Sequence, residues 1–276
     1  MRDKREGTPI WDFCEGHHKE GNKDTDRHYR MLSFLNPIIN TFKQQDWLTV
    51  GDGLGREAIF LKKQKVKKVE CSNIWFSDFN KKEISKRVDS CKEIDMLNID
   101  KSISTDLTLA KECLHHLNRP IYGLYNLLDI SSHGLIFIEP HDTRCQNKRN
   151  EFTLMPSRED SFLLSSGDRA EWESCGNYKY NFSVREACKL AWALEFPHVL
   201  LKGFNDAFGD LYNPPKEGEN DLNKFKEYVE RCEYLDDLGR QNKRPYNMII
   251  CCILKKELTP EQREGVGDFL IIDKPK

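Results

Sequence analysis

The sequence predicts an α/β protein in which helices cover a mostly parallel β-sheet. Short apolar runs that are typical of buried strands alternate along the chain with segments of helical periodicity. This alternation indicates βαβ units, because two parallel strands need a crossover connection, which is usually a helix. The glycine-rich segment WLTVGDGLGREA joins the first apolar run to a helical pattern. Ligands bind such sheets at the carboxyl ends of the strands, so this segment marks a candidate site.

The apolar runs and helical patterns define the elements in chain order. We predict strands at residues 47–50, 68–72, 107–110, 134–139, 199–202 and 248–255. We predict helices at residues 56–63, 122–128, 184–194 and 225–238. These elements form one core domain over residues 46–256.

Three segments lie outside this regular pattern. Residues 1–45 are expected to form a cap over the ligand, with Arg27 and Tyr29 as contacts. Residues 142–180 are long, polar and poorly periodic, and they follow the carboxyl end of a predicted strand. Such excursions usually act as lids or bind ligands, so we expect a lid or acceptor-binding insertion there. Residues 257–276 are expected to be a charged surface extension.

The composition argues against several classes of protein. The 276 residues carry a net charge of −2, which gives no overall electrostatic attraction to nucleic acids or anionic membranes. No apolar run is long enough to span a bilayer, and the first residues do not form a signal peptide. Ten cysteines without a C-x-x-C pair predict reduced thiols in a cytoplasmic protein and no metal site. The adjacent Cys251 and Cys252 are expected to point to opposite faces of one strand.

The glycine turn has the pattern G-x-G-x-G, formed by Gly51, Gly53 and Gly55. It is not a P-loop, because no Gly-Lys-Ser/Thr follows, and it is not the dinucleotide fingerprint G-x-G-x-x-G. Two interpretations remain open. The glycines either let a ligand approach the backbone, or they form a tight turn that packs a helix against the sheet.

Longer segments carry a resemblance to a known family. The G-x-G-x-G turn, Asn73 at the end of the second strand and the pair Asp95-Met96 resemble class I S-adenosylmethionine-dependent methyltransferases. The segment LTLAKECLHHLNRPIYGLYNLLDISSHGLIFIEP resembles, more narrowly, a bacterial group of these enzymes that is associated with cell-surface sugar biosynthesis. WLTVGDG, GNYKYNFSVREACKLA and KGFND are further matches, and the resemblance covers residues 47–256. It implies a single Rossmann-like domain with seven strands in the order 3-2-1-4-5-7-6, the last of them antiparallel.

The resemblance also implies a site for S-adenosylmethionine. The glycine turn, including Asp52, would meet the methionine and ribose portions, and Asn73 would meet the ribose hydroxyls. Asp95 would accept a hydrogen bond from the adenine amino group, and Met96 would pack on the ring or donate its backbone N–H to it. Lys111 and Glu112 would flank the methionine end, largely through backbone groups.

Two positions depart from the family pattern. Thr49 stands where the family usually has an acidic residue, two positions before the first glycine. Asn73 replaces the usual carboxylate at the end of the second strand and loses a charge-assisted hydrogen bond to the ribose. A turn-forming role for Asn73 is the alternative.

The segment KECLHH supplies candidate catalytic residues for methyl transfer to a hydroxyl, which requires removal of a proton. Helical spacing would place Glu112 on one face with His115 or His116, so that the carboxylate orients an imidazole. We predict His116 as the base, ahead of His115, and rank His141 and Glu139 behind them. The alternative for either histidine of the segment is a capping or packing role.

The acceptor is expected to be a small molecule, with His141, Tyr178, Tyr180 and Arg185 as contacts. By family resemblance, it is a sugar or sugar-linked precursor of a capsule or lipopolysaccharide. A phosphoramidate or another phosphorylated capsule precursor is the alternative, with Arg185 as the anion contact. A non-catalytic binding protein and a nicotinamide-dependent oxidoreductase remain alternatives from other classes. The sequence does not predict an oligomeric state.

Overall fold

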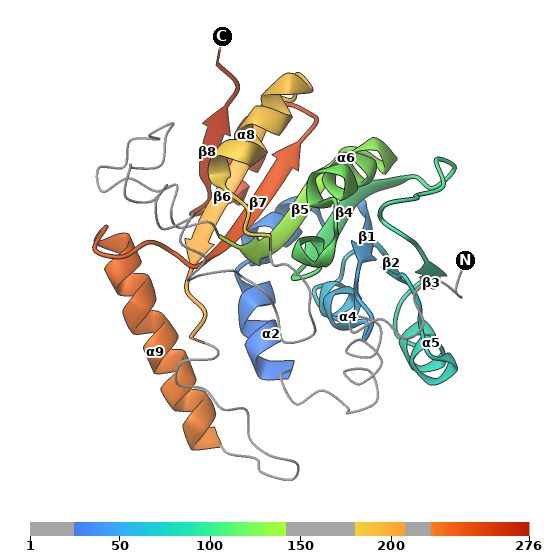
Figure 1. Ribbon diagram of the computed structural model, residues 1–276, viewed down its shortest axis with the longest axis horizontal. Helices are drawn as coiled ribbons and strands as arrows, with labels where there is room; N and C mark the ends of the chain where they lie inside the picture. The colour runs from blue at the N-terminus through green and yellow to red at the C-terminus, as the bar shows by residue number, and fades with distance from the viewer. Residues whose placement is uncertain (1–24, 142–179, 208–221, 276) are drawn as a thin grey trace.

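The computed structural model describes residues 25–141, 180–207 and 222–275 of the chain. In these ranges eight strands form one sheet, in the order β3-β2-β1-β4-β5-β7-β6-β8 (Figure 1). In that spatial order the strands are Ser90–Glu93, Lys68–Asn73, Asp46–Val50, Thr105–Lys111, Ser131–Pro140, Met248–Leu254, His198–Phe204 and Leu270–Asp273. Strands β1 to β5 pair in parallel, and β7 is antiparallel to both β5 and β6. The predicted strand order is confirmed, and an eighth strand extends it.

Helices cover both faces of this sheet. They are α2 (Thr25–Ser33), α3 (Asn36–Phe42), α4 (Arg56–Lys63), α5 (Asp78–Ser85), α6 (Pro120–Ile130), α8 (Val184–Ala193), α9 (Leu222–Arg240), α10 (Pro260–Gly265) and the short 3-10 helix η2 (Leu114–His116). Apolar side chains of α2, α3, α4 and α5 pack into one buried cluster, and those of α6 and α8 pack into another. Figure 1 shows α6 and α8 together on the near side of the sheet. The domain is therefore a three-layer α/β sandwich.

Strand β7 shows why the sheet needs helices on both faces. All of its residues are buried, and successive side chains alternate between the two apolar clusters. Cys252 belongs to the cluster under α2 to α5, whereas Cys251 belongs to the cluster under α6 and α8. This confirms that the two thiols point to opposite faces. The cysteines in the described ranges carry free thiols, as expected.

The C-terminal residues correct one prediction. Residues 257–276 were expected to form a surface extension, but α10 and β8 close one edge of the fold, and β8 pairs with β6. Thr259 and Gln262 form a capping box that starts α10. Val266 and Phe269 are buried, with exposed fractions of 0% and 5%. The prediction was wrong because the many charged residues of this segment masked its few buried apolar anchors.

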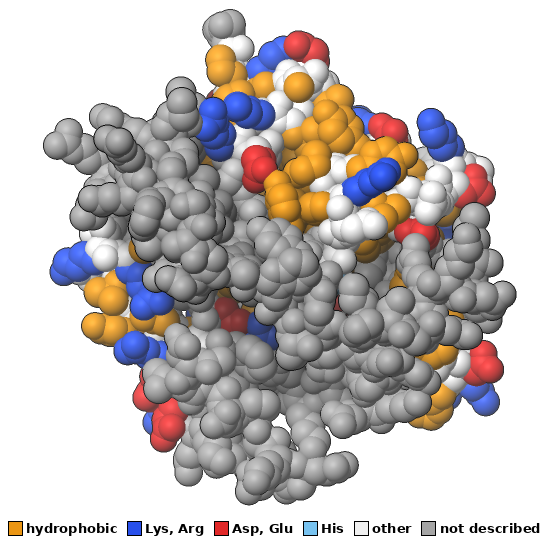
Figure 2. Space-filling model, viewed as in Figure 1, with side chains coloured by type: hydrophobic (Ala, Val, Ile, Leu, Met, Phe, Trp, Pro, Cys, Tyr) orange, Lys and Arg blue, Asp and Glu red, His pale blue; other side chains and the backbone are white. Residues whose placement is uncertain are grey.

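The outer surface is mixed in character. Figure 2 shows hydrophobic side chains gathered on the side where α6 and α8 lie, and Tyr122 of α6 is 51% exposed. No helix in the three described ranges is long and apolar enough to cross a membrane.

Candidate functional site

The candidate site lies where the strand order changes direction. Proceeding from β1, the chain builds the sheet outward through β2 and β3, and it then returns to the other side of β1 with β4. Crevices form at the carboxyl ends of the strands at such a switch point, because the two flanking connections leave in opposite directions. The glycine turn follows β1 and Lys111 ends β4, so both predicted segments meet here.

Packing explains two of the three glycines. Gly51 has a φ of +70°, and a Cβ atom there would lie 2.6 Å from the Cβ atom of Cys113. Gly55 has a φ of +68°, and a Cβ atom there would lie 2.8 Å from Ile84. A side chain at either position would be strained and would clash. Gly53 is not among the glycines with positive φ, so backbone strain does not explain it.

Asp52 caps the helix that follows the turn. The N-cap residue of α4 is Gly55, which has no side chain to accept hydrogen bonds. The Oδ2 atom of Asp52 instead accepts hydrogen bonds from the Ala58 backbone N–H at 2.9 Å and from the Thr49 hydroxyl at 3.0 Å. Burial and the adjacent Glu57 carboxylate raise the pKa of Asp52, which favours its neutral form. Thr49 therefore supports the turn by hydrogen bonding where an acidic residue would place a second charge.

Lys111 supplies the positive charge that pairs with the neighbouring carboxylates of Glu57 and Glu112. Its ammonium lies 3.3 Å from Glu57 and donates a hydrogen bond to Glu112 at 2.9 Å. Burial favours the neutral form of Glu57, but the Lys111 charge, a hydrogen bond with Asp52 and the His28 charge together lower the pKa of Glu57 to about 2. Burial likewise opposes the charge of Lys111, yet Glu112 and Glu57 raise its pKa. The side chain of Lys111 thus forms internal ion pairs beside the glycine turn.

Glu112 does not have the expected helical conformation. Its φ is +47°, and η2 begins only at Leu114. Its carboxylate accepts hydrogen bonds from Arg27 at 2.8 Å and from Lys111, on the side of α2. The prediction that Glu112 orients a histidine by helical spacing is therefore wrong. The left-handed residue breaks the helical register on which it was based.

His115 is oriented by another carboxylate, that of Glu139. The Nδ1 atom of His115 lies 2.5 Å from Oε2 of Glu139, which comes from the neighbouring strand β5. The Oε1 atom of Glu139 accepts hydrogen bonds from the backbone N–H groups of Cys113 and Leu114 at 3.0 and 2.8 Å. Both His115 and Glu139 are buried, and the ring of His116 stacks on His115 with centroids 4.0 Å apart. The Glu139 carboxylate therefore holds together the His115 ring and the backbone of the turn that carries it.

The predicted adenosine contacts lie beside the glycine turn. The amide nitrogen of Asn73 donates a hydrogen bond to the Trp75 carbonyl at 2.7 Å, so this side chain also forms the turn that follows β2. The carboxylate of Asp95 accepts hydrogen bonds from the Leu97 backbone at 2.9 Å and from a neighbouring asparagine. Met96 lies close to the glycine turn, since its Cε atom would be 3.8 Å from a Cβ atom at Gly51.

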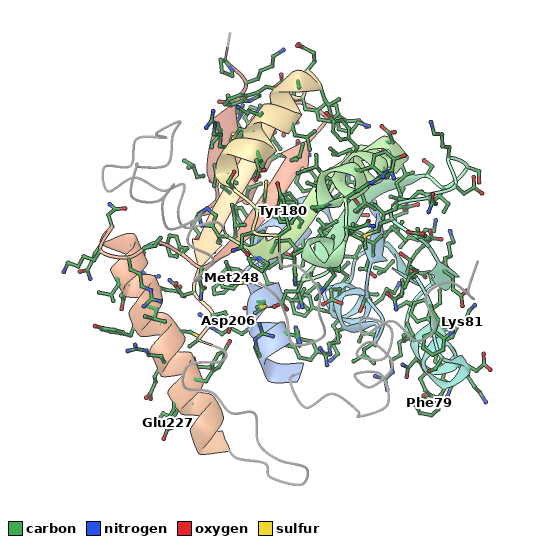
Figure 3. All side chains as sticks on the ribbon, in the orientation of Figure 1. Phe79, Lys81, Tyr180, Asp206, Glu227 and Met248 are labelled. Carbon is green, nitrogen blue, oxygen red and sulfur yellow. The ribbon has the colours of Figure 1, made fainter. Side chains whose placement is uncertain are left out.

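An ion pair that the sequence did not predict lies next to these residues. Arg27 of α2 donates hydrogen bonds to Asp206, which follows β6. The hydroxyl of Tyr228 in α9 donates a hydrogen bond to the same carboxylate at 2.6 Å. Figure 3 shows Asp206 between α2 and α9. The matching segment KGFND contains Asp206, but no spacing rule connects it with Arg27, which is 179 residues away in the sequence.

The expected acceptor contacts are only partly described. Tyr178 lies outside the described residues. The Nδ1 atom of His141 lies 3.0 Å from the Tyr246 carbonyl. Tyr180 donates a hydrogen bond from its hydroxyl to Glu186, and Arg185 lies in the first turn of α8. Among the described residues, no group of three or more histidine, cysteine, aspartate or glutamate side chains could hold a metal ion.

Comparisons with solved structures identify the type of fold. No protein-family model matches the sequence, and no curated protein matches it. A SAM-dependent methyltransferase from Archaeoglobus fulgidus superposes with a TM-score of 0.50 at 14% identity, over 89% of this chain and 100% of the other. Magnesium protoporphyrin IX methyltransferase from Synechocystis gives a TM-score of 0.48 at 12% identity, over 92% and 98%. The A. fulgidus superposition, with the strand order, shows that the chain has the α/β Rossmann-like methyltransferase fold with a mostly parallel sheet.

Proposed function

We propose that the protein is an S-adenosylmethionine-dependent O-methyltransferase that acts on a small molecule. The observation that supports this most strongly is the meeting of the glycine turn with residues 111–116 at the switch point of a methyltransferase-like sheet. The first segment suits a nucleoside ligand, and the second provides an oriented imidazole. Because the fold alone does not determine chemistry, the argument depends on these residues.

The residues at this edge fit the proposed cofactor. The turn leads into α4, and the dipole at the start of this helix favours an electron-rich ligand beside the turn. Met96 places an apolar side chain close to Gly51, as an adenosine ligand requires. Gly53 would let the ligand approach the backbone, and Asn73 and Asp95 would contact the ribose and the adenine. When bound, S-adenosylmethionine would supply an electrophilic methyl group on its sulfonium.

His115 is the proposed general base. Glu139 accepts a hydrogen bond from the Nδ1–H group of the neutral ring, and the ring lone pair is then on Nε2, the atom that would take the acceptor proton. The fixed carboxylate also stabilises the imidazolium that forms. This geometry favours His115, whose ring is oriented by Glu139, as the base ahead of His116. The Glu139 carboxylate, rather than Glu112, orients the ring.

The proposed acceptor is a sugar or sugar-linked precursor of a cell-surface polysaccharide, methylated in the cytoplasm. The support for this class is the resemblance of the segment KECLHHLNRP and its neighbours to the bacterial group described above. A phosphorylated precursor would have the same hydroxyl chemistry, with Arg185 in the first turn of α8 as a cationic contact.

A transfer assay tests the proposal. The protein is incubated with S-adenosylmethionine labelled in its methyl group and with separate panels of nucleotide sugars, sugar phosphates and neutral sugars. We expect label in a sugar-containing acceptor, and we expect the Glu139→Gln variant to transfer much more slowly. Cofactor binding without transfer to any panel would instead support a non-catalytic binding protein of this fold.

A further inference from the structure

One guanidinium group connects two distant strands at the functional edge. Arg27 donates hydrogen bonds to Asp206 after β6 and to Glu112 after β4, the latter at 2.8 Å. These strands are not neighbours, because β5 and β7 separate them in the sheet. The side chains are nearly buried, with exposed fractions of 10% for Arg27, 6% for Asp206 and 18% for Glu112. Arg27 therefore crosses the edge where the proposed acceptor would enter.

The Glu112 end of this connection has a rare backbone conformation. A φ of +47° lies in the left-handed region, which non-glycine residues avoid because Cβ crowds the backbone. Such residues persist only when surrounding contacts hold them, and they cluster at functional sites. The Glu112 backbone N–H donates to the Ile138 carbonyl at 2.8 Å, and its carboxylate is bound by Arg27 and Lys111. These contacts hold the residue in place.

The conformation of Glu112 sets the direction of the next residues. From this bend, the N–H groups of Cys113 and Leu114 donate to Glu139, the carboxylate that orients His115. The side chain of Cys113 also lies against Gly51 in the glycine turn. The bend at Glu112 therefore positions both the turn that carries the proposed base and the Cys113 side chain that packs against the glycine turn.

We propose that Arg27 is a positioning residue that holds Glu112 in its left-handed conformation and so keeps this turn competent for binding. Its effect on cofactor affinity rests on the function proposed above. If only a fraction of molecules has the competent turn, the apparent association constant falls to that fraction of its full value. Lys111 also pairs with Glu112 but comes from the adjacent position in the chain, and His28 of α2 lies 3.4 Å from the Glu112 carboxylate and 2.7 Å from the Lys111 ammonium. Arg27 adds the long-range anchor through Asp206.

A conformational rescue tests this role. Binding of S-adenosylhomocysteine is measured by calorimetry for the wild type and for Arg27→Met. We expect Arg27→Met to weaken binding about tenfold, the factor that corresponds to the penalty of a left-handed non-glycine residue. In the Arg27→Met background, Glu112→Gly should restore most of the affinity, because glycine adopts a positive φ without strain. The matched control Glu112→Ala removes the same charge but keeps the strain, so it should not restore binding.

Hydrogen exchange provides a readout that does not depend on the cofactor. The amides of Cys113 and Leu114 should exchange faster in Arg27→Met and return to wild-type protection with Glu112→Gly. This readout tests the role of Arg27 even if the wild type fails to bind S-adenosylhomocysteine, which would refute the proposed function instead. If Arg27→Met does not fold, Arg27→Lys replaces it, because lysine keeps the charge without the bidentate reach.

Two results would overturn the role of Arg27. The first is a folded Arg27→Met protein with unchanged amide exchange and unchanged affinity. The second is equal recovery by Glu112→Gly and Glu112→Ala, which would assign the effect to charge balance and not to backbone conformation. A lower melting temperature of Arg27→Met without selective recovery by Glu112→Gly would also speak against the role, in the same way as the second result.

Discussion

His115 of η2 and Glu139 of β5 form a hydrogen-bonded pair, with 2.5 Å between Nδ1 and Oε2. The carboxylate is completely buried and also holds the backbone of the turn that carries the histidine. An ionised carboxylate at this position favours the tautomer with the proton on Nδ1 and holds the ring in one direction. Orientation of an imidazole by a buried carboxylate is the arrangement that general-base catalysis requires.

This pair leads to a prediction about rate. His115→Ala should lower kcat for methyl transfer by about 10² to 10⁴, the usual contribution of a general base. Glu139→Gln should also lower kcat, because the ring loses its fixed tautomer, while His116→Ala should have a smaller effect. The affinity for S-adenosylhomocysteine, measured by calorimetry, should change little in His115→Ala. A greater loss of kcat in His116→Ala than in His115→Ala would instead identify His116 as the general base.

The buried ion pair of Glu57 and Lys111 predicts a pH-dependent stability. The pKa of Glu57 is lowered to about 2 from the ordinary value of 4.5, so its contribution is present above pH 4.5 and is lost as the pH falls toward 2. Glu57→Gln removes one of the two carboxylates that pair with Lys111 and should lower the unfolding free energy at pH 7 by roughly 3 kcal/mol, since one pKa unit corresponds to about 1.4 kcal/mol. Urea unfolding at pH 7, 4 and 3 measures this difference.

The difference between Glu57→Gln and wild type should shrink as the pH is lowered. The matched control is Glu83→Gln, whose carboxylate pairs with Lys86 at the surface and should matter little at any pH. A stability difference that stays constant from pH 7 to pH 3 would show that Glu57 does not gain its stability from ionisation.

The C-terminal segment should be part of the folding unit. Phe269 is 5% exposed and belongs to the buried cluster under α2 to α5. Phe269→Ala should therefore cost about 3–5 kcal/mol, as expected for removal of a buried aromatic side chain. The matched control Leu270→Ala changes the next residue, which is 58% exposed, and should change the urea midpoint much less. Equal small effects would mean that this segment is only a surface extension.

The sequence predicts the most deeply buried strands well where they contain a continuous apolar run. The run at 248–255 is one example, and the observed strand β7 spans Met248–Leu254. By contrast, α5 and β3 are polar and were not predicted as elements. The edge strand β3 has no fully buried residue, so its sequence carries little hydrophobic signal.

The candidate site was harder to predict than the strands. The switch-point segments could be located, because glycines and polar residues follow apolar runs. The contacts could not be located, since they join segments far apart in the chain, such as Arg27 with Asp206. The error at Glu112 has a similar cause. A single left-handed residue changes the register of the whole segment KECLHH, and no local pattern indicates it.

Calorimetric titration with S-adenosylhomocysteine tests the central claim, that the glycine turn binds the cofactor. Wild-type protein should bind with micromolar or tighter affinity. Gly53→Val should remain folded by circular dichroism but lose binding, because its side chain would take the space that the ligand needs. Normal binding by folded Gly53→Val would leave the turn a purely structural feature. No heat with S-adenosylhomocysteine or S-adenosylmethionine, together with binding of NADH, would contradict the account.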